Sequence, residues 1–221
     1  QDGKPLYFVS DAAREEAFHS MDAWGRGEAE VVKPAGQDGW HFPPVPSPDG
    51  KWLAFSDQTQ TLYVMPAGGG APKAVDRSAQ SEIRQYVWSP DGRWLAYTRN
   101  VPTDYSSIHV YDTKDGVSRA VTGPTTADAW PAWDPDGRYL YFISNRAVNP
   151  FLGGRDWDDL DLKADKVYLV TLRKDVKNPL LDAAGLPPEE EDAGKKDEAG
   201  DGKKGEEKDD APKPVEIDFD G

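Results

Sequence analysis

The chain has 221 residues, of which 37% are hydrophobic, and its formal net charge is −14. A chain this acidic, with no basic stripe, is poorly suited to nucleic acid or an anionic membrane surface, so neither is expected as a partner. The absence of cysteine excludes thiol catalysis, disulfide bonds and cysteine-ligated zinc. Eight tryptophans and 11% aromatic residues nevertheless predict an aromatic core, next to a polar part that contributes little to it.

No apolar run approaches the ~18 residues of a membrane-spanning helix. The first residues, QDGKPLYFVSD, lack the charged and apolar regions of a signal peptide. We therefore expect a cytoplasmic protein. The periplasm remains the alternative, because a chain without cysteine suits either compartment.

Residues 4–33 predict a partial structural unit. PLYFVSD (5–11) reads as a strand, and AFHSMDAWGRGEAEVV (17–32) reads as two strands around a glycine-containing turn. This unit lacks the initial strand and the Pro-Asp-Gly turn that three later units share.

The three later units, at 43–76, 85–122 and 130–219, align on a Pro-Asp-Gly turn. Their turn aspartates, Asp49, Asp91 and Asp136, are 42 and 45 residues apart. A period of roughly 40–50 residues made of short strands is typical of a propeller blade. We therefore predict an all-β fold: a β-propeller segment of four-stranded antiparallel blades, three complete and one partial, from a ring of six to eight.

Each Pro-Asp-Gly turn is followed by a strand that reads as buried on both faces: KWLAFS, RWLAYT and RYLYFI. Proline presets φ at the first central position of the turn, aspartate suits the second, and glycine accepts the fourth. Apolar residues at consecutive positions are typical of strands packed between stacked sheets.

The fourth unit contains two expected insertions, at 147–165 and 173–213. The second is rich in Glu, Lys, Asp, Gly and Ala, a composition that predicts disorder. Because PVEIDF (214–219) resumes a strand-like alternation, we expect it to be the fourth strand of this blade. The charged stretch is therefore interpreted as a loop within the fold rather than a tail.

Three residues are candidates for lining the channel of the ring: His41, Arg84 and Asp128. Each precedes or begins an expected first strand, and first strands line the central channel of a propeller. For His41 a packed or solvated side chain is the competing interpretation. His19 and His109 share one position of the repeat, which favours a structural role for both.

No catalytic constellation is found in the sequence, so no catalytic, cofactor-binding or metal-binding residue and no cofactor is expected. There is no Gly-x-Ser-x-Gly elbow and no His-Glu-x-x-His motif. DPDG (134–137) lacks the remaining ligands of a calcium loop. The carboxylates of DWDDLD (156–161) are interpreted as a solvated acidic loop. Taken alone, these residues predict a scaffold or recognition surface.

The repeats resemble the WD40-like propeller repeats of TolB, of prolyl-oligopeptidase-type enzymes and of tricorn proteases. Two regions resemble the second propeller of tricorn-like proteases more specifically. The first is SEIRQYVWSPDGRWLAYTRN (81–100) with SSIHVYDTKDG (106–116). The second is PDGRYLYFISNRAVNPFL (135–152) with KVYLVTLRKDVKNPL (166–180). One departure is Pro46, which stands where the next two blades have Trp88 and Trp133.

This resemblance implies a hydrolase, an S41-type serine peptidase that degrades oligopeptides. In that family the propellers filter and channel peptides, and the catalytic residues lie in later domains. The implied partners are peptide substrates, the other blades and catalytic domains of the same chain, and further copies in a homo-oligomer. The alternatives are a TolB-like binding propeller without enzymatic activity, and a propeller cap on a prolyl-oligopeptidase-like hydrolase.

Overall fold

The computed structural model describes most of the chain outside the charged insertion. Residues 181–211 of the insertion predicted to be disordered, 173–213, lie outside the described residues, and so do residues 156–158 of the acidic stretch 156–161. The described residues are 5–12, 16–36, 39–147, 150–152, 159–161, 164–180 and 212–219.

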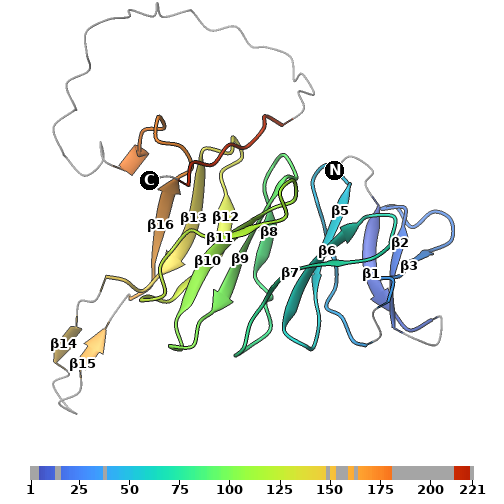
Figure 1. Cartoon of the computed structure of the whole chain (residues 1–221), viewed down its shortest axis with the longest axis horizontal. Coiled ribbons are helices and arrows are strands. Elements are labelled where there is room, and N and C mark those ends of the chain that lie inside the picture. The colour runs from blue at the N-terminus through green and yellow to red at the C-terminus, as the bar shows by residue number, and fades with distance from the viewer. Residues whose placement is uncertain are drawn as a thin grey trace, which may run out of the picture.

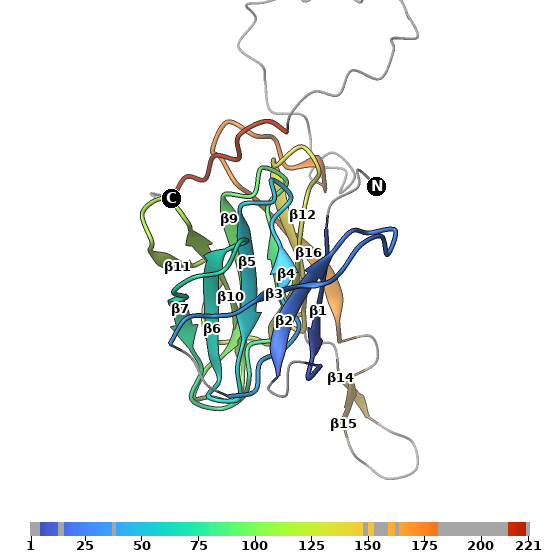
Figure 2. The same cartoon turned by 90° about the vertical axis from the view of Figure 1, so that its right-hand side faces the viewer.

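Every named element in the described ranges is a β-strand, which confirms the all-β prediction. Four antiparallel sheets lie side by side in chain order, from right to left in Figure 1 and one behind another in Figure 2. We call these sheets blades one to four. Blade one contains β1 (Leu6–Ser10), β2 (Ala17–Met21) and β3 (Glu30–Val32); blade two contains β4 (Val45–Pro46), β5 (Trp52–Ser56), β6 (Thr61–Pro66) and β7 (Lys73–Arg77). Blade three contains β8 (Tyr86–Trp88), β9 (Trp94–Asn100), β10 (Ser106–Asp112) and β11 (Ser118–Ala120); blade four contains β12 (Asp128–Trp133), β13 (Tyr139–Ser144) and β16 (Lys166–Thr171).

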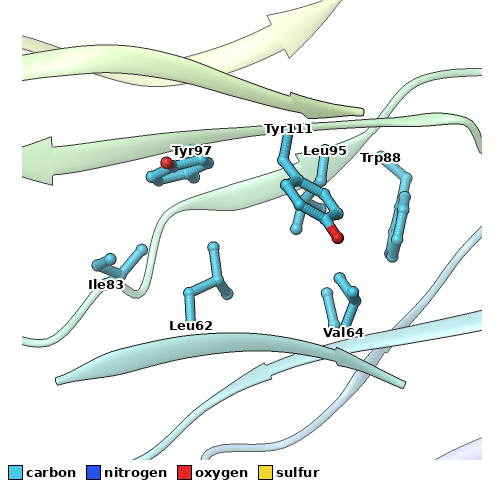
Figure 3. Packing of buried hydrophobic residues seen from close by; sticks show 8 residues of the cluster. Leu62, Val64, Ile83, Trp88, Leu95, Tyr97 and Tyr111 are labelled. Atoms are coloured by element: carbon cyan, nitrogen blue, oxygen red, sulfur yellow. The ribbon is translucent and has the colours of Figure 1, made fainter. Parts of the chain in front are cut away.

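The second strand of each inner blade is buried on both faces, as its sequence predicts. In β5, Leu53 and Phe55 pack with blade one, whereas Ala54 packs with blade three. Figure 3 shows the cluster between blades two and three, where Leu62 and Val64 of β6 face side chains of blade three. Removing this apolar surface from water stabilises the stack by ~25 cal/mol for each Å² buried.

A stacked pair of rings recurs at one register in all four blades. In each case one ring lies on the second strand and the other on the directly opposite residue of the third. Centroid distances are 5.3–6.0 Å and interplanar angles 20–25°. His19 and His109 are the third-strand members in blades one and three, so both have the structural role that the repeat indicates. The pairs are Phe8–His19, Phe55–Tyr63, Tyr97–His109 and Phe142–Tyr168.

Indole hydrogen bonds join the first strands of successive blades. The Nε1 group of Trp88 donates to the carbonyl oxygen of Val45 at 3.0 Å. Likewise Trp133 Nε1 donates to the carbonyl oxygen of Val87 at 3.1 Å. Each bond satisfies a polar group in an otherwise apolar interface. Pro46, at the equivalent position of blade two, has no N–H to donate in this way.

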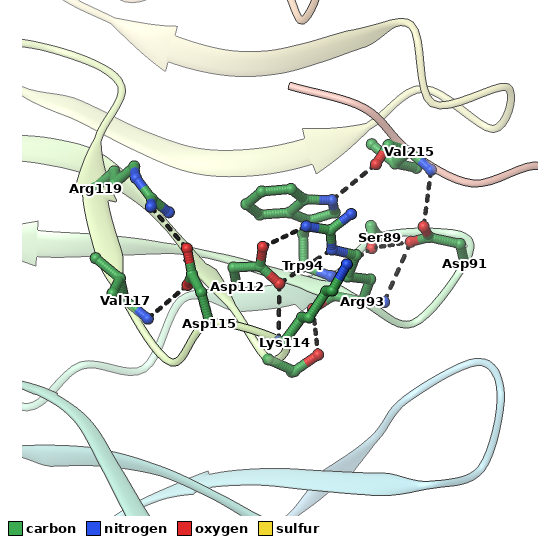
Figure 4. A network of polar contacts seen from close by, with 11 residues as sticks. Ser89, Asp91, Arg93, Trp94, Asp112, Lys114, Asp115, Val117, Arg119 and Val215 are labelled. Atoms are coloured by element: carbon green, nitrogen blue, oxygen red, sulfur yellow. Dashed lines mark hydrogen bonds and ion pairs between the residues drawn. The ribbon is translucent and has the colours of Figure 1, made fainter. Parts of the chain in front are cut away.

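In blades two and three the Pro-Asp-Gly turn is closed by a serine and an aspartate. In blade three Ser89 Oγ donates to Asp91 Oδ1 at 2.5 Å, and the backbone N–H of Trp94 donates to Ser89 Oγ at 2.9 Å (Figure 4). Ser47 and Asp49 make the same hydrogen bond in blade two, at 2.6 Å. These contacts hold the turn in the conformation that the sequence predicts.

Blade four differs from the prediction in its last strand. Residues 214–219 do not form a fourth strand next to β16; among the described residues this blade has three strands. The first insertion carries a separate hairpin, β14 (Pro150–Leu152) paired with β15 (Asp159–Asp161), which projects away from the blades (Figure 1).

Residues 212–219, which we call the return segment, instead cross from blade four to blade three. The backbone N–H of Val215 donates to Asp91 Oδ2 at 2.7 Å, and Trp94 Nε1 donates to the Val215 carbonyl oxygen at 2.9 Å (Figure 4). The N–H of Asp218 donates to the Leu172 carbonyl oxygen at 2.8 Å. The Val215 side chain is 1% exposed within the core between the two blades. Contacts to turns and side chains thus replace the expected sheet ladder.

We expect Gly92→Ala to lower the melting temperature more than Gly50→Ala. Both glycines have φ near +72°, where an L-residue costs ~1–2 kcal/mol. A Cβ at Gly92 would also lie 2.8 Å from Asp49 Cγ of blade two, whereas a Cβ at Gly50 would meet no atom within 4 Å. The clash adds ~1–3 kcal/mol.

Thermal unfolding of both variants measures this difference. In an Asp49→Ala background the effect of Gly92→Ala should shrink, because the clashing carboxylate is gone. Equal melting temperatures for the two glycine variants would contradict the contact between the turns.

Candidate functional site

The first strands of blades two, three and four, β4, β8 and β12, each form one edge of their sheet. An edge strand presents N–H and C=O groups that no neighbouring strand pairs. Such an edge can accept an extended peptide through main-chain hydrogen bonds. We call this the inner edge and describe the side chains along it.

His41 lies inside the packing between blades one and two. It is 6% exposed, and its ring makes edge contacts with Phe18 and Phe55, with centroids 5.7 and 5.4 Å away. Burial lowers the pKa of His41, while the negative charges of Asp57 and Glu16 oppose that shift. The neutral, packed ring favours the structural interpretation of His41.

Arg84 is the exposed member of the three candidates. Its guanidinium carbon lies 3.9 Å from the ring centroid of Phe42, which belongs to the preceding unit. The ring of Phe42 also makes a T-shaped contact with Trp40, at 4.3 Å between centroids. Trp40 is 46% exposed, so an exposed indole and a cation contact the same phenyl ring at this part of the edge.

Asp128, at the start of β12, is completely buried and ion-paired. Arg146 Nη2 donates to Asp128 Oδ2 at 2.9 Å, and Thr126 Oγ1 donates to Asp128 Oδ1 at 3.0 Å. Burial alone would raise the pKa of Asp128, but hydrogen bonds from Ser144, Thr122, Arg146 and Thr126 outweigh it and hold the pKa below its usual value. The carboxylate therefore positions the start of β12 and is not presented to solvent.

Trp130 is an inner-edge residue that the sequence reasoning missed. It lies at an irregularity in the pairing of β12 with β13, has φ of +58°, and is 62% exposed. Its N–H donates to the Gln85 side-chain oxygen of blade three at 3.1 Å. A large side chain in the left-handed region is a strained arrangement, and such strain is concentrated at functional sites. The signal in the sequence was the proline inside the strand DAWPAW, because proline within a strand is confined to edges and bulges.

The three blades are thus linked along the inner edge by side chains. The row is Trp40, Phe42, Arg84, Gln85 and Trp130, of which Arg84 and the two indoles are exposed. An exposed indole offers a face for stacking on ring or apolar side chains. Together with unpaired main-chain groups, the row can bind an extended polypeptide; no acid–base pair or nucleophile takes part in it.

The described residues include no group of three or more His, Asp or Glu side chains arranged to hold a metal ion. In the same residues no helix is long and apolar enough to cross a membrane.

Comparison with known proteins identifies the family. The whole chain, residues 1–221, matches the family described as the tricorn protease second β-propeller domain. The chain belongs to this family. The recognition made from the repeat motifs is therefore confirmed.

Individual relatives agree with this assignment. The tricorn protease of Thermoplasma volcanium is 28% identical over 72% of this chain and 16% of its own length. Tricorn protease homolog 1 of Streptomyces coelicolor is 25% identical over 79% of the chain and 16% of its own length. This chain therefore spans about a sixth of the length of these relatives.

A solved structure confirms the propeller fold. The crystal structure of the tricorn protease superposes with a TM-score of 0.71 over 90% of this chain and 19% of that chain, at 22% identity. At this identity the likeness shows the fold alone, a segment of a β-propeller.

We expect Asp128→Asn to destabilise the chain by about 1–3 kcal/mol at neutral pH, as for other hydrogen bonds to charged groups. The folded state depresses the pKa of Asp128, so the stabilisation is fully present above the unfolded value near pH 4. It is lost as the pH falls through the folded pKa.

Thermal unfolding of the wild type and of Asp128→Asn between neutral and acidic pH tests this. The matched control is Asp136→Asn, which removes an exposed partner of Arg138 and should change little. A stability difference for Asp128→Asn that persists undiminished in acid would contradict the ion-pair explanation.

Proposed function

We propose that this chain is the propeller portion of a serine peptidase that degrades oligopeptides, and that its inner edge guides and filters the peptide substrate. Other domains of the same protein carry out the hydrolysis, and the propeller forms a wall of the channel through which the peptide passes. The observation that carries the proposal is the linked row of exposed indoles and Arg84 across three blades.

Membership of the tricorn second-propeller family supports a place for the chain next to further blades and catalytic domains. The same resemblance supports assembly of several copies. Both remain parts of the proposal, because this chain spans about a sixth of the curated relatives.

Two kinds of contact at the inner edge support a preference for extended peptides. Unpaired main-chain groups on β8 and β12 suit any extended polypeptide, whatever its sequence. The indoles add stacking with apolar side chains, and Arg84 adds attraction for carboxylates. Such a surface tolerates many sequences and favours extended chains, because most main-chain groups of a folded chain are already paired.

We expect Trp130→Ala to raise KM for oligopeptide hydrolysis by the complete gene product about two- to tenfold, the range for loss of an aromatic contact of ~0.5–1.4 kcal/mol. The turnover number should not change, because Trp130 binds substrate away from the reacting bond. Steady-state kinetics with unstructured oligopeptides provides the measurement.

The control is Trp24→Ala, which removes another exposed indole, on the turn between β2 and β3. It should leave KM unchanged. The 221-residue chain alone should not hydrolyse peptides. If Trp130→Ala also leaves KM unchanged, the inner edge is not the peptide path. If the complete gene product binds peptides without hydrolysing them, the TolB-like alternative is correct.

A further inference from the structure

Val215 of the return segment is held on blade three through both of its main-chain groups. Its N–H donates to Asp91 Oδ2 at 2.7 Å, and its carbonyl oxygen accepts from Trp94 Nε1 at 2.9 Å (Figure 4). We call the side chains of Asp91 and Trp94 the clip. Two side chains that bind the N–H and the C=O of one residue recognise an extended main chain, as peptide-binding sites do.

In blades two and four the corresponding turn aspartate is engaged by its own neighbour. A basic residue follows each Pro-Asp-Gly turn. Lys51 Nζ lies 2.9 Å from Asp49 Oδ2, and Arg138 Nη2 lies 3.0 Å from Asp136 Oδ2. In both blades a cation therefore lies next to the turn carboxylate.

In blade three the basic residue is held away from the turn. Arg93 donates from Nε to Asp112 Oδ1 at 3.0 Å and from Nη2 to Asp112 Oδ2 at 2.5 Å, a bidentate pair of the strong kind. Asp112 lies opposite Trp94 in the register of β9 with β10. Pro66 stands at that register of blade two, which therefore lacks the carboxylate. Because Asp112 engages Arg93, Asp91 Oδ2 is left to accept a main-chain N–H.

A glycine of blade four makes room for the Val215 side chain, which is 1% exposed. A Cβ placed on Gly137 would lie 2.6 Å from Val215 Cγ2, so a larger residue would fill this hole. Between blades two and three, the equivalent Gly92 faces Asp49 directly, and a Cβ there would lie 2.8 Å from Asp49 Cγ. Those two turns meet with no segment between them. Two blades can therefore pack together without an inserted segment.

The residues after the clipped valine alternate between the two sides of an extended chain. Ile217 packs into the core between blades three and four, and the ring of Phe219 lies 6.0 Å from the ring of Trp94. Glu216, between them, is exposed and accepts a hydrogen bond from Arg173 Nη1 at 3.1 Å. The site therefore contacts apolar side chains at every second position and acidic ones between.

We propose that the clip and the hole at Gly137 form a peptide-binding site, and that the return segment is its resident ligand. The site takes an extended polypeptide with valine or isoleucine in the hole, apolar residues two and four places further on, and acidic residues between. A peptide of this pattern from outside the chain competes with the return segment. The inference concerns binding alone and does not depend on the proposed function.

The contacts of the return segment suit such an exchange. The segment adds no strand to either blade, so its departure leaves every sheet ladder of the described residues intact. Its tether, which joins residues 180 and 212, gives it an effective concentration on the order of 1 mM. An outside peptide should therefore enter the intact chain only near that concentration, and readily once the resident segment has left the site.

The first experiment empties the site in the full chain. Val215→Asp places a carboxylate in the apolar hole next to Asp91, so the return segment should leave the site. A labelled peptide with the sequence of residues 212–219, PKPVEIDF, should then bind saturably with Kd in the micromolar range, measured by fluorescence anisotropy. The wild-type chain should bind it at least about tenfold more weakly, because its own segment competes.

The matched control is the same peptide with aspartate in place of the valine, which should not bind. A melting curve establishes that the Val215→Asp chain is folded. A second route needs no substitution at the site: in a wild-type chain with a protease site inserted between residues 181 and 211, cutting should let excess labelled peptide replace the segment. Absence of binding to the folded variant, or of exchange after the cut, would overturn the proposal.

Paired changes in site and peptide test the hole. On the Val215→Asp chain, a peptide with alanine in place of the valine should bind about tenfold more weakly than the valine peptide, because two buried methyl groups are lost. When Gly137→Ala is added, its methyl group occupies part of the hole, so the preference for valine should shrink. Both peptides are compared on the same protein, so any loss of chain stability cancels. An unchanged preference would contradict the place given to the valine.

Asp112→Asn tests how the clip is kept free. Without the charge of Asp112, Arg93 should turn towards Asp91, and the affinity for the peptide should fall about two- to tenfold. The asparagine oxygen can still accept the N–H of Lys114, which Asp112 Oδ1 accepts at 2.8 Å. The control is Asp49→Asn, which removes a carboxylate from the turn of blade two and should leave the affinity unchanged. An equal effect of the two substitutions would overturn the role given to Asp112.

Discussion

Burial of both faces of every inner sheet is the constraint on which the rest of the structure depends. A sheet that is apolar on both faces must bury each of them against another element. Here each blade shields the next, and the indole groups of Trp88 and Trp133 fix the spacing by reaching the main chain of the preceding blade. The consecutive apolar residues of the second strands follow from this arrangement, because neither face meets water.

Much of the blade structure could be predicted from the sequence, because the residues that form each blade are close in the chain and recur in each repeat. The Pro-Asp-Gly turns, the doubly buried strands and the shared position of His19 and His109 are all visible at a fixed spacing. Features that depend on contacts between distant residues were not predictable. PVEIDF alternates like a strand, but hydrogen bonds to Asp91 and Trp94 hold it across two blades instead. The sequence places Asp128 at the start of a strand, but it does not show that this side chain is buried or that Arg146 pairs with it.

The inner edge illustrates how a rigid scaffold supports an adaptable surface. The Asp128–Arg146 pair and the indole hydrogen bonds hold the first strands in place. The side chains left outside, above all Trp130, are then displayed at positions set by the blades rather than by their own preferences. The strained backbone of Trp130 is maintained because the surrounding hydrogen bonds and packing determine it.

The return segment has a consequence for the chain that joins residues 180 and 212. Both ends of this connection are fastened to the same end of blades three and four, through Leu172, Asp91 and the buried Val215. The length of the connection therefore has little influence on how the blades are spaced. A tag or a reporter domain could be inserted there without altering the stack. After a protease cut at the same place, the return segment should stay bound through its own contacts.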